Sequence, residues 1–110
     1  MKLMVFILNR VESLEPLLTA FADHGIGGAT ILSSTGMARA LADVEDSIFG
    51  SLRAILDPER EANKTIITVL KDEQVAEALA AIEETVGDLS APDTGIVFTV
   101  PVDFIKGLHA

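Results

Sequence analysis

Few side chains in this chain are suited to covalent catalysis or to metal binding. The sequence contains no cysteine, and its two histidines, His24 and His109, lie far apart without the spacing of metal ligands. Ser33, Ser34 and Ser51 have no nearby histidine and no nucleophile-elbow pattern. No pair of carboxylates lies on a recognisable common face. We therefore expect a protein that is not an enzyme and that has neither a catalytic site nor a metal site.

The cationic side chains suit anion binding better. Four of them lie in or beside one segment: Arg39, Arg53, Arg60 and Lys64. The guanidinium fork of arginine matches carboxylate and phosphate groups, so these residues are candidates for an anionic ligand. Acidic residues accompany them throughout the segment, which leaves solvated surface ion pairs as the alternative.

A second candidate for anion binding is the turn that contains Gly87, Thr94 and Gly95. Backbone amides in such a turn can cradle a small anion. The alternative is structural, because glycine commonly ends a helix and threonine commonly begins a strand. His24 has a structural interpretation too, since a partial positive charge is favourable at the C-terminus of a helix.

The elements that must position these residues follow a repeated pattern. Apolar and β-branched runs predict strands at residues 1–8, 28–35, 64–71 and 94–101. Helical spacing predicts one helix from an N-cap at Ser13 to Gly25 and another from a cap at Asp72 to Gly87. The order predicts one α+β domain over residues 1–110, with a ferredoxin-like βαββαβ fold. Its four-stranded antiparallel sheet carries both helices on one face.

The other face of this sheet is predicted to be apolar as well. The first strand is apolar on both sides, and the last strand has Ile96, Phe98 and Val100 on one side and Val97 on the other. Large uncovered apolar faces are rare on monomers. We therefore expect a homo-oligomer, and a monomer with an unusually apolar surface is the alternative.

Residues 36–62 form a connection that is long for a compact domain. Apolar residues recur there at three- and four-residue steps, which is typical of an amphipathic helix interrupted by Gly50. The candidate contacts to a protein partner are Ile48, Phe49, Leu52, Arg53, Ile55 and Leu56. The alternative is a helical flap that packs on its own subunit.

Three features of the sequence resemble the PII signal-transduction superfamily of small trimeric metabolite sensors. Residues 28–39, GATILSSTGMAR, resemble the second strand of that family running into its T-loop, with Thr30 at the family's threonine position. Gly36 to Arg39 stands where the family has Gly-Phe-Gly-Arg. Residues 91–103, APDTGIVFTVPVD, resemble the B-loop and the last strand. The resemblance covers nearly the whole chain, and it implies a trimer with effector sites at subunit clefts.

The chain also departs from that pattern. Relatives that bind ATP supply cations from the B-loop, whereas GDLSAPDTG contains two aspartates and no cation. Asp88 and Asp93 would repel a triphosphate. The chain has no tyrosine, so the family's modified T-loop tyrosine is absent. The resemblance implies Thr30, Gly36 and Arg39 as candidate ligand contacts, and it leaves the cofactor unidentified. The cation cluster adds Lys64 to these candidates, and the turn adds Gly87, Thr94 and Gly95.

Charge and hydropathy limit the partners. The net charge of −9 argues against nucleic-acid binding, and no apolar run approaches the roughly 20 residues that span a bilayer. We expect a cytoplasmic regulatory protein that binds a small effector and signals through residues 36–62 to a protein partner. The alternatives are a structural or interaction module without an effector, and a divalent-metal-binding trimer similar to the CutA family.

Overall fold

The computed structural model describes residues 1–42 and 63–108. Its elements in chain order are β1 (Lys2–Leu8), α1 (Leu14–Asp23), β2 (Thr30–Ser33), α2 (Met37–Ala42), β3 (Lys64–Leu70), α3 (Val75–Val86) and β4 (Gly95–Pro101). Short 3-10 turns at Val11–Ser13 and Asp72–Gln74 precede α1 and α3. The four predicted strands are thus present, each within a residue or two of its expected range.

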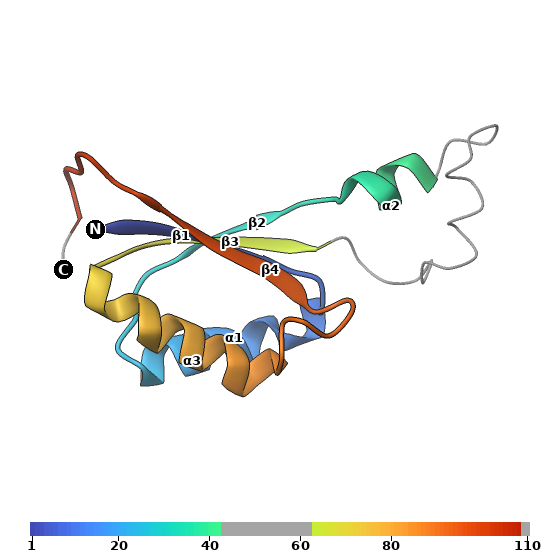
Figure 1. Ribbon diagram of the computed structural model, residues 1–110, viewed down its shortest axis with the longest axis horizontal. Coiled ribbons are helices and arrows are strands. Elements are labelled where there is room, and N and C mark those ends of the chain that lie inside the picture. The colour runs from blue at the N-terminus through green and yellow to red at the C-terminus, as the bar shows by residue number, and fades with distance from the viewer. Residues whose placement is uncertain (43–62, 109–110) are drawn as a thin grey trace.

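The four strands form one antiparallel sheet in the order β2-β3-β1-β4. The helices α1 and α3 lie side by side across one face of it, and neither covers the other face (Figure 1). The chain therefore has an α+β architecture that is compatible with a ferredoxin-like fold. The central strand β1 is the most apolar of the four in sequence, as expected for a strand with neighbours on both sides.

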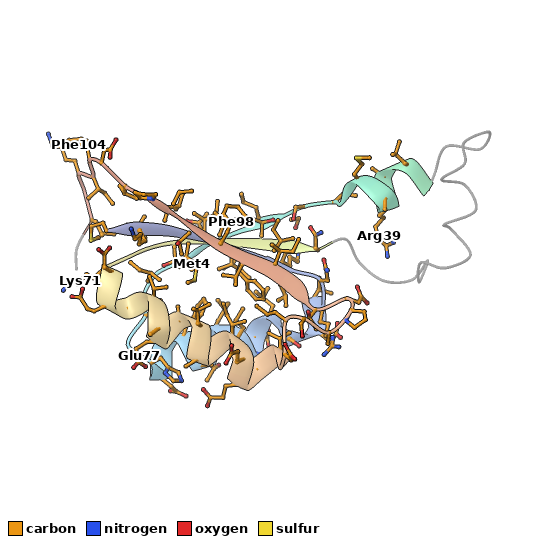
Figure 2. The ribbon with its side chains drawn as sticks, viewed as in Figure 1. Met4, Arg39, Lys71, Glu77, Phe98 and Phe104 are labelled. Carbon is orange, nitrogen blue, oxygen red and sulfur yellow. The ribbon has the colours of Figure 1, made fainter. Side chains whose placement is uncertain are left out.

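The core lies between the sheet and the two helices. Every second residue of β1 is buried there, namely Met4, Phe6 and Leu8. Figure 2 shows Met4 on the helix side of the sheet and Phe98 on the opposite side. The helices contribute the remaining large side chains at helical spacing, and these include Leu17, Phe21, Ile82 and Val86.

The opposite face of the sheet, which we call the open face, is apolar and carries no charge. The strand registers place eleven side chains on it: Leu3, Val5, Ile7, Thr30, Leu32, Thr65, Ile67, Val69, Ile96, Phe98 and Val100. Ile96 is 61% exposed and Phe98 is 46% exposed, so large apolar groups on this face meet solvent. The prediction that both sides of the sheet are apolar is confirmed.

The first helix begins at the predicted cap, whereas the beginning of the second helix differs from the sequence prediction. Ser13 is the N-cap of α1, but its side chain makes no capping hydrogen bond. Asp72 was expected to cap the second helix, and it lies instead in the 3-10 turn, while Gln74 is the N-cap of α3. The carboxylate of Asp72 lies 3.0 Å from the amino group of Met1. The ion pair with the N-terminus draws this side chain away from the helix, and the sequence alone does not reveal that contact.

The end of α1 follows the prediction. Gly25 has a φ of 82°, in the left-handed region that favours glycine. The N–H of Ile26 donates to the carbonyl of Phe21 at 2.8 Å and the N–H of Gly25 donates to that of Ala22 at 3.1 Å. These two bonds form a Schellman closure, which directs the chain toward β2.

Between β2 and β3 the chain leaves the sheet. Helix α2 extends from the end of β2, away from the helical layer (Figure 1). The predicted partner-binding residues Ile48, Phe49, Leu52, Arg53, Ile55 and Leu56 lie outside the described residues. Among the helices that are described, none is long and apolar enough to cross a membrane.

Candidate functional site

A hollow of about 610 Å³ opens where the chain between α1 and β2 diverges from β3. β2 pairs with β3 only as far as the pair Thr30–Ile67, so the last part of β3 is paired with β1 on one side and has no described strand on the other. Residues 25–30 form one wall, and residues 67–71 form the other. Thr30, predicted as a ligand contact, lines this hollow.

One hydrogen bond joins the two walls. The hydroxyl of Thr68 is buried and donates to the carbonyl of Gly28 at 2.6 Å. Gly27 and Gly28 have no atom within 4 Å of the position that a Cβ would occupy, so their side of the hollow is open. This bond therefore holds the wall in place beyond the Thr30–Ile67 pair, and the backbone of Gly27 and Gly28 is exposed beside it.

The polar lining of the hollow favours an anion. Lys71 and Gln74 line it together with apolar side chains that include Ile26 and Leu70. No carboxylate belongs to the lining within the described ranges. A single lysine beside apolar surface suits a small molecule with an apolar part and a limited negative charge. No sequence motif marks Lys71 or Gln74. The glycine-rich stretch GIGGAT, which forms the facing wall, is a local signal for an accessible backbone.

The other predicted ligand contacts lie elsewhere. The registers place Ser33, Lys64, Leu8 and Gly95 in one row across the sheet. Lys64 and Gly95 are thus two strands apart, or about 10 Å. They lie at the opposite end of β3 from the hollow, which divides the predicted set into two groups. Gly36 and Arg39 belong to neither, because Gly36 precedes α2 and Arg39 lies within it (Figure 2).

Lys64 belongs to a polar network at the edge of the sheet, next to the connection of residues 36–62, which we call the insert. Its Nζ atom donates to the hydroxyl of Ser33 at 2.8 Å. The hydroxyl of Ser34 lies 2.7 Å from that of Thr65 and also bonds to the side chain of Asn63. These contacts join the end of β2 to the start of β3, the two segments from which the insert leaves the sheet. They therefore support the base of the insert.

The residues of the predicted anion turn have structural roles. Thr94 is buried, and its hydroxyl lies 2.9 Å from the carbonyl of Ala91. A Cβ on Gly95 would lie 2.5 Å from the carbonyl oxygen of Ile7 and 2.7 Å from the ring of Phe6. Gly87 ends α3 with a φ of 84°. Packing and backbone geometry therefore account for all three residues without a ligand.

Asp88 stabilises the same turn. Its carboxylate accepts hydrogen bonds from the backbone N–H of Ser90 at 2.9 Å and from the Ser90 hydroxyl at 2.7 Å. These bonds lower the pKa of Asp88 below its ordinary value, the backbone bond having the larger effect. A negative charge at this position makes the turn less favourable for an anion.

His24 connects the two helices. Its ring nitrogens lie 2.8 Å from a carboxylate oxygen of Glu77 and 2.7 Å from one of Glu84. Within residues 1–42 and 63–108 no group of three or more His, Cys, Asp or Glu side chains is placed to hold a metal ion. His109 lies outside these residues.

Comparisons with known proteins add no relatives. No protein-family model matches the chain, and no curated protein matches it at a significant level.

Proposed function

We propose that this chain is a homo-oligomeric regulatory protein that binds a small anionic effector in clefts between its copies. One observation carries the proposal. Thr30, Ile67 and Val69 belong to the open face and also line the hollow. A second copy that covers the open face therefore also adds a wall to the hollow, so that the two together form a cleft.

The open face supports an oligomer on energetic grounds. Each square ångström of apolar surface removed from water contributes about 25 cal/mol. The face has no charged side chain whose desolvation would oppose its burial. We propose a trimer, in keeping with the resemblance to the PII superfamily, and a cytoplasmic location.

The insert supplies the output in this proposal. Residues 36–62 start directly beyond β2, whose first residue, Thr30, lines the hollow. An effector that contacts Thr30 changes the environment of the strand that leads into the insert. Repositioning of a loop on ligand binding is a common switching mechanism. The insert then binds or releases a protein partner according to whether the effector is present.

Thermal-shift measurements test the effector site. The panel contains ATP, ADP, AMP, cyclic dinucleotides, 2-oxoglutarate, bicarbonate and divalent metal ions. A ligand at 100 times its dissociation constant stabilises the folded protein by about 2.7 kcal/mol. We expect a response to at least one anionic compound, and we expect Gly28→Phe to abolish it by filling the hollow.

Ala22→Phe is the matched control, because Ala22 lies on the exposed surface of α1 and does not line the hollow. Loss of the response in both variants would mean that the added phenylalanine acts through stability alone. No response to any anionic compound would favour the alternative of a structural or interaction module without an effector. A response to divalent metals alone would favour the metal-binding alternative.

A further inference from the structure

His24 lies one residue before a wall of the hollow. It is the C-cap of α1, and Gly25, the first residue of that wall, follows it directly. The next residue, Ile26, is buried and lines the hollow, and its N–H donates to the carbonyl of Phe21. A change in the position of His24 therefore acts on the backbone at the point where the wall begins.

The two carboxylates that His24 contacts lie on α3, whose start belongs to the other side of the hollow. Gln74, the N-cap of α3, lines the hollow together with Lys71. Glu77 follows Gln74 by about one helical turn, and Figure 2 shows it toward the end of α3 that lies nearest to Lys71. The contacts of His24 with Glu77 and Glu84 therefore tie the start of one wall to the helix that follows the opposite one.

The elements packed around His24 carry only acidic side chains besides it. The charged residues of the two helices are Glu15 and Asp23 on α1 and Glu77, Glu83 and Glu84 on α3, and the wall has none. The hydrogen bond to Glu77, followed by that to Glu84, raises the pKa of His24 above its ordinary value. No lysine or arginine of these elements is available to replace a protonated His24 between the two carboxylates.

The protonation state of His24 determines how many of its two contacts are hydrogen bonds. An imidazolium donates from both ring nitrogens, whereas a neutral imidazole has one N–H and one lone pair. At the observed distances of 2.8 Å to Glu77 and 2.7 Å to Glu84, the lone pair of a neutral ring would face an ionised carboxylate oxygen. These two groups repel each other, so one carboxylate must separate from the ring when the proton is lost.

We propose that His24, Glu77 and Glu84 form a pH-sensitive clamp that fixes the start of the wall of residues 25–30 when His24 is protonated and releases it when His24 is neutral. The inference rests on the proposed function, and it adds pH as a second input to the effector site. The bond from Thr68 to Gly28 contains no titratable group, so it holds the far part of the wall at every pH. Release is therefore confined to the part nearest α1.

Amide hydrogen exchange, followed by NMR between about pH 5.5 and 8.5, tests the clamp without any effector. The reporter is the amide of Ile26, whose bond to Phe21 opens when the start of the wall is released. Its protection factor compares the observed exchange rate with that of an unstructured chain at the same pH, which removes the direct effect of pH on exchange. The amide of Phe6, which pairs with Ile66 inside the sheet, reports opening of the whole fold.

We expect Ile26 to be less protected than Phe6 and to lose protection about two- to fivefold as pH rises through the raised pKa of His24, since contacts between exposed charged groups are weak. His24→Arg keeps a permanent cation with donors for both carboxylates, so the protection of Ile26 should stay high at every pH. His24→Gln never carries a charge, so protection should be low throughout. This variant retains His109 and the terminal amino group, and a pH response caused by either would persist in it.

Glu84→Gln provides a second variant that leaves His24 in place. The new amide can donate to the lone pair of a neutral ring, so the protection of Ile26 should depend less on pH than in the wild-type chain.

Two results would overturn the clamp. Equal protection of Ile26 and Phe6 at every pH would mean that the wall opens only when the whole chain unfolds. The same pH response in the wild-type chain and in His24→Gln would place its origin in another group. Neither result concerns the effector itself, which the thermal-shift panel and Gly28→Phe test separately, so failure of the clamp and failure of the proposed function are distinguishable.

Discussion

The Nδ1 atom of His24 lies 2.8 Å from a carboxylate oxygen of Glu77. The other ring nitrogen lies 2.7 Å from Glu84, which is seven residues further along α3. Ionised carboxylates only accept hydrogen bonds, so both contacts are hydrogen bonds at the same time only when the ring is an imidazolium, in which both nitrogens donate. The hydrogen bond to Glu77 raises the pKa of His24 most, followed by that to Glu84. This contact joins the C-terminus of α1 to two turns of α3.

We expect the stability that His24 contributes to depend on pH. A raised pKa in the folded state means that protonation favours folding. The contribution is fully present below the unfolded-state pKa of about 6.5, and it is lost as pH rises through the raised pKa of the folded state. Urea unfolding of the wild-type chain and of His24→Gln between pH 5 and 9 measures the difference in free energy of unfolding.

That difference should be largest at pH 5 and should shrink with rising pH. Asp72 and Asp88 do not disturb this window, because their lowered pKa values place their titration at acidic pH. The variant Glu77→Gln removes one of the two carboxylates, so it should reduce the pH dependence. A difference between wild type and His24→Gln that is constant over the whole range would contradict the imidazolium assignment.

Phe98 lies near the centre of the open face, where Val5 is its partner on β1. We expect Phe98→Lys to convert the proposed oligomer to single chains, because an ammonium group buried in an apolar interface has no partner. Sedimentation velocity measures the change. Ala80→Lys places the same charge on the exposed surface of α3 and should leave the assembly intact. Dissociation by both variants would point to net charge as the cause.

Gly95 is required by its neighbours. A methyl group there would overlap the carbonyl of Ile7 and the ring of Phe6, so Gly95→Ala should lower the free energy of unfolding by about 1–3 kcal/mol. Gly27→Ala is the matched control, since nothing lies within 4 Å of its added Cβ and its φ is not positive. We expect it to be neutral or stabilising by up to about 1 kcal/mol. Chemical denaturation of the two variants compares them, and equal stabilities would exclude the overlap.

Several parts of the fold followed from the sequence. The strand positions are confirmed because β-branched and apolar runs mark them locally, as in Lys64–Leu70. The closure at Gly25 is confirmed for a similar reason, since a glycine after a helical stripe is a local signal. The position of the cap at Ser13 is confirmed, although its side chain makes no capping bond. The cap at Asp72 was wrong, because this carboxylate pairs with the N-terminal amino group, a contact that the neighbouring sequence does not reveal.

The candidate site was less predictable. Thr30 was found through a family resemblance, and the structure places it in a hollow with Lys71 and Gln74, which no motif marked. Lys64 and Gly95 were predicted in the same set of ligand contacts as Thr30, and they lie toward the other end of the sheet. The separation follows from strand register, which depends on pairing between distant parts of the chain.

The sequence by itself determined that this sheet would be apolar on both faces. Alternation along a strand has a period of two residues, so the two faces of β1 can be read directly from Met4 and Val5 with their neighbours. Only the tertiary structure decided that Thr68 would donate to Gly28, 40 residues away, and that His24 would lie between two carboxylates of α3. Contacts of this kind depend on how helices and strands pack, and packing brings together residues whose separation in sequence carries no signal.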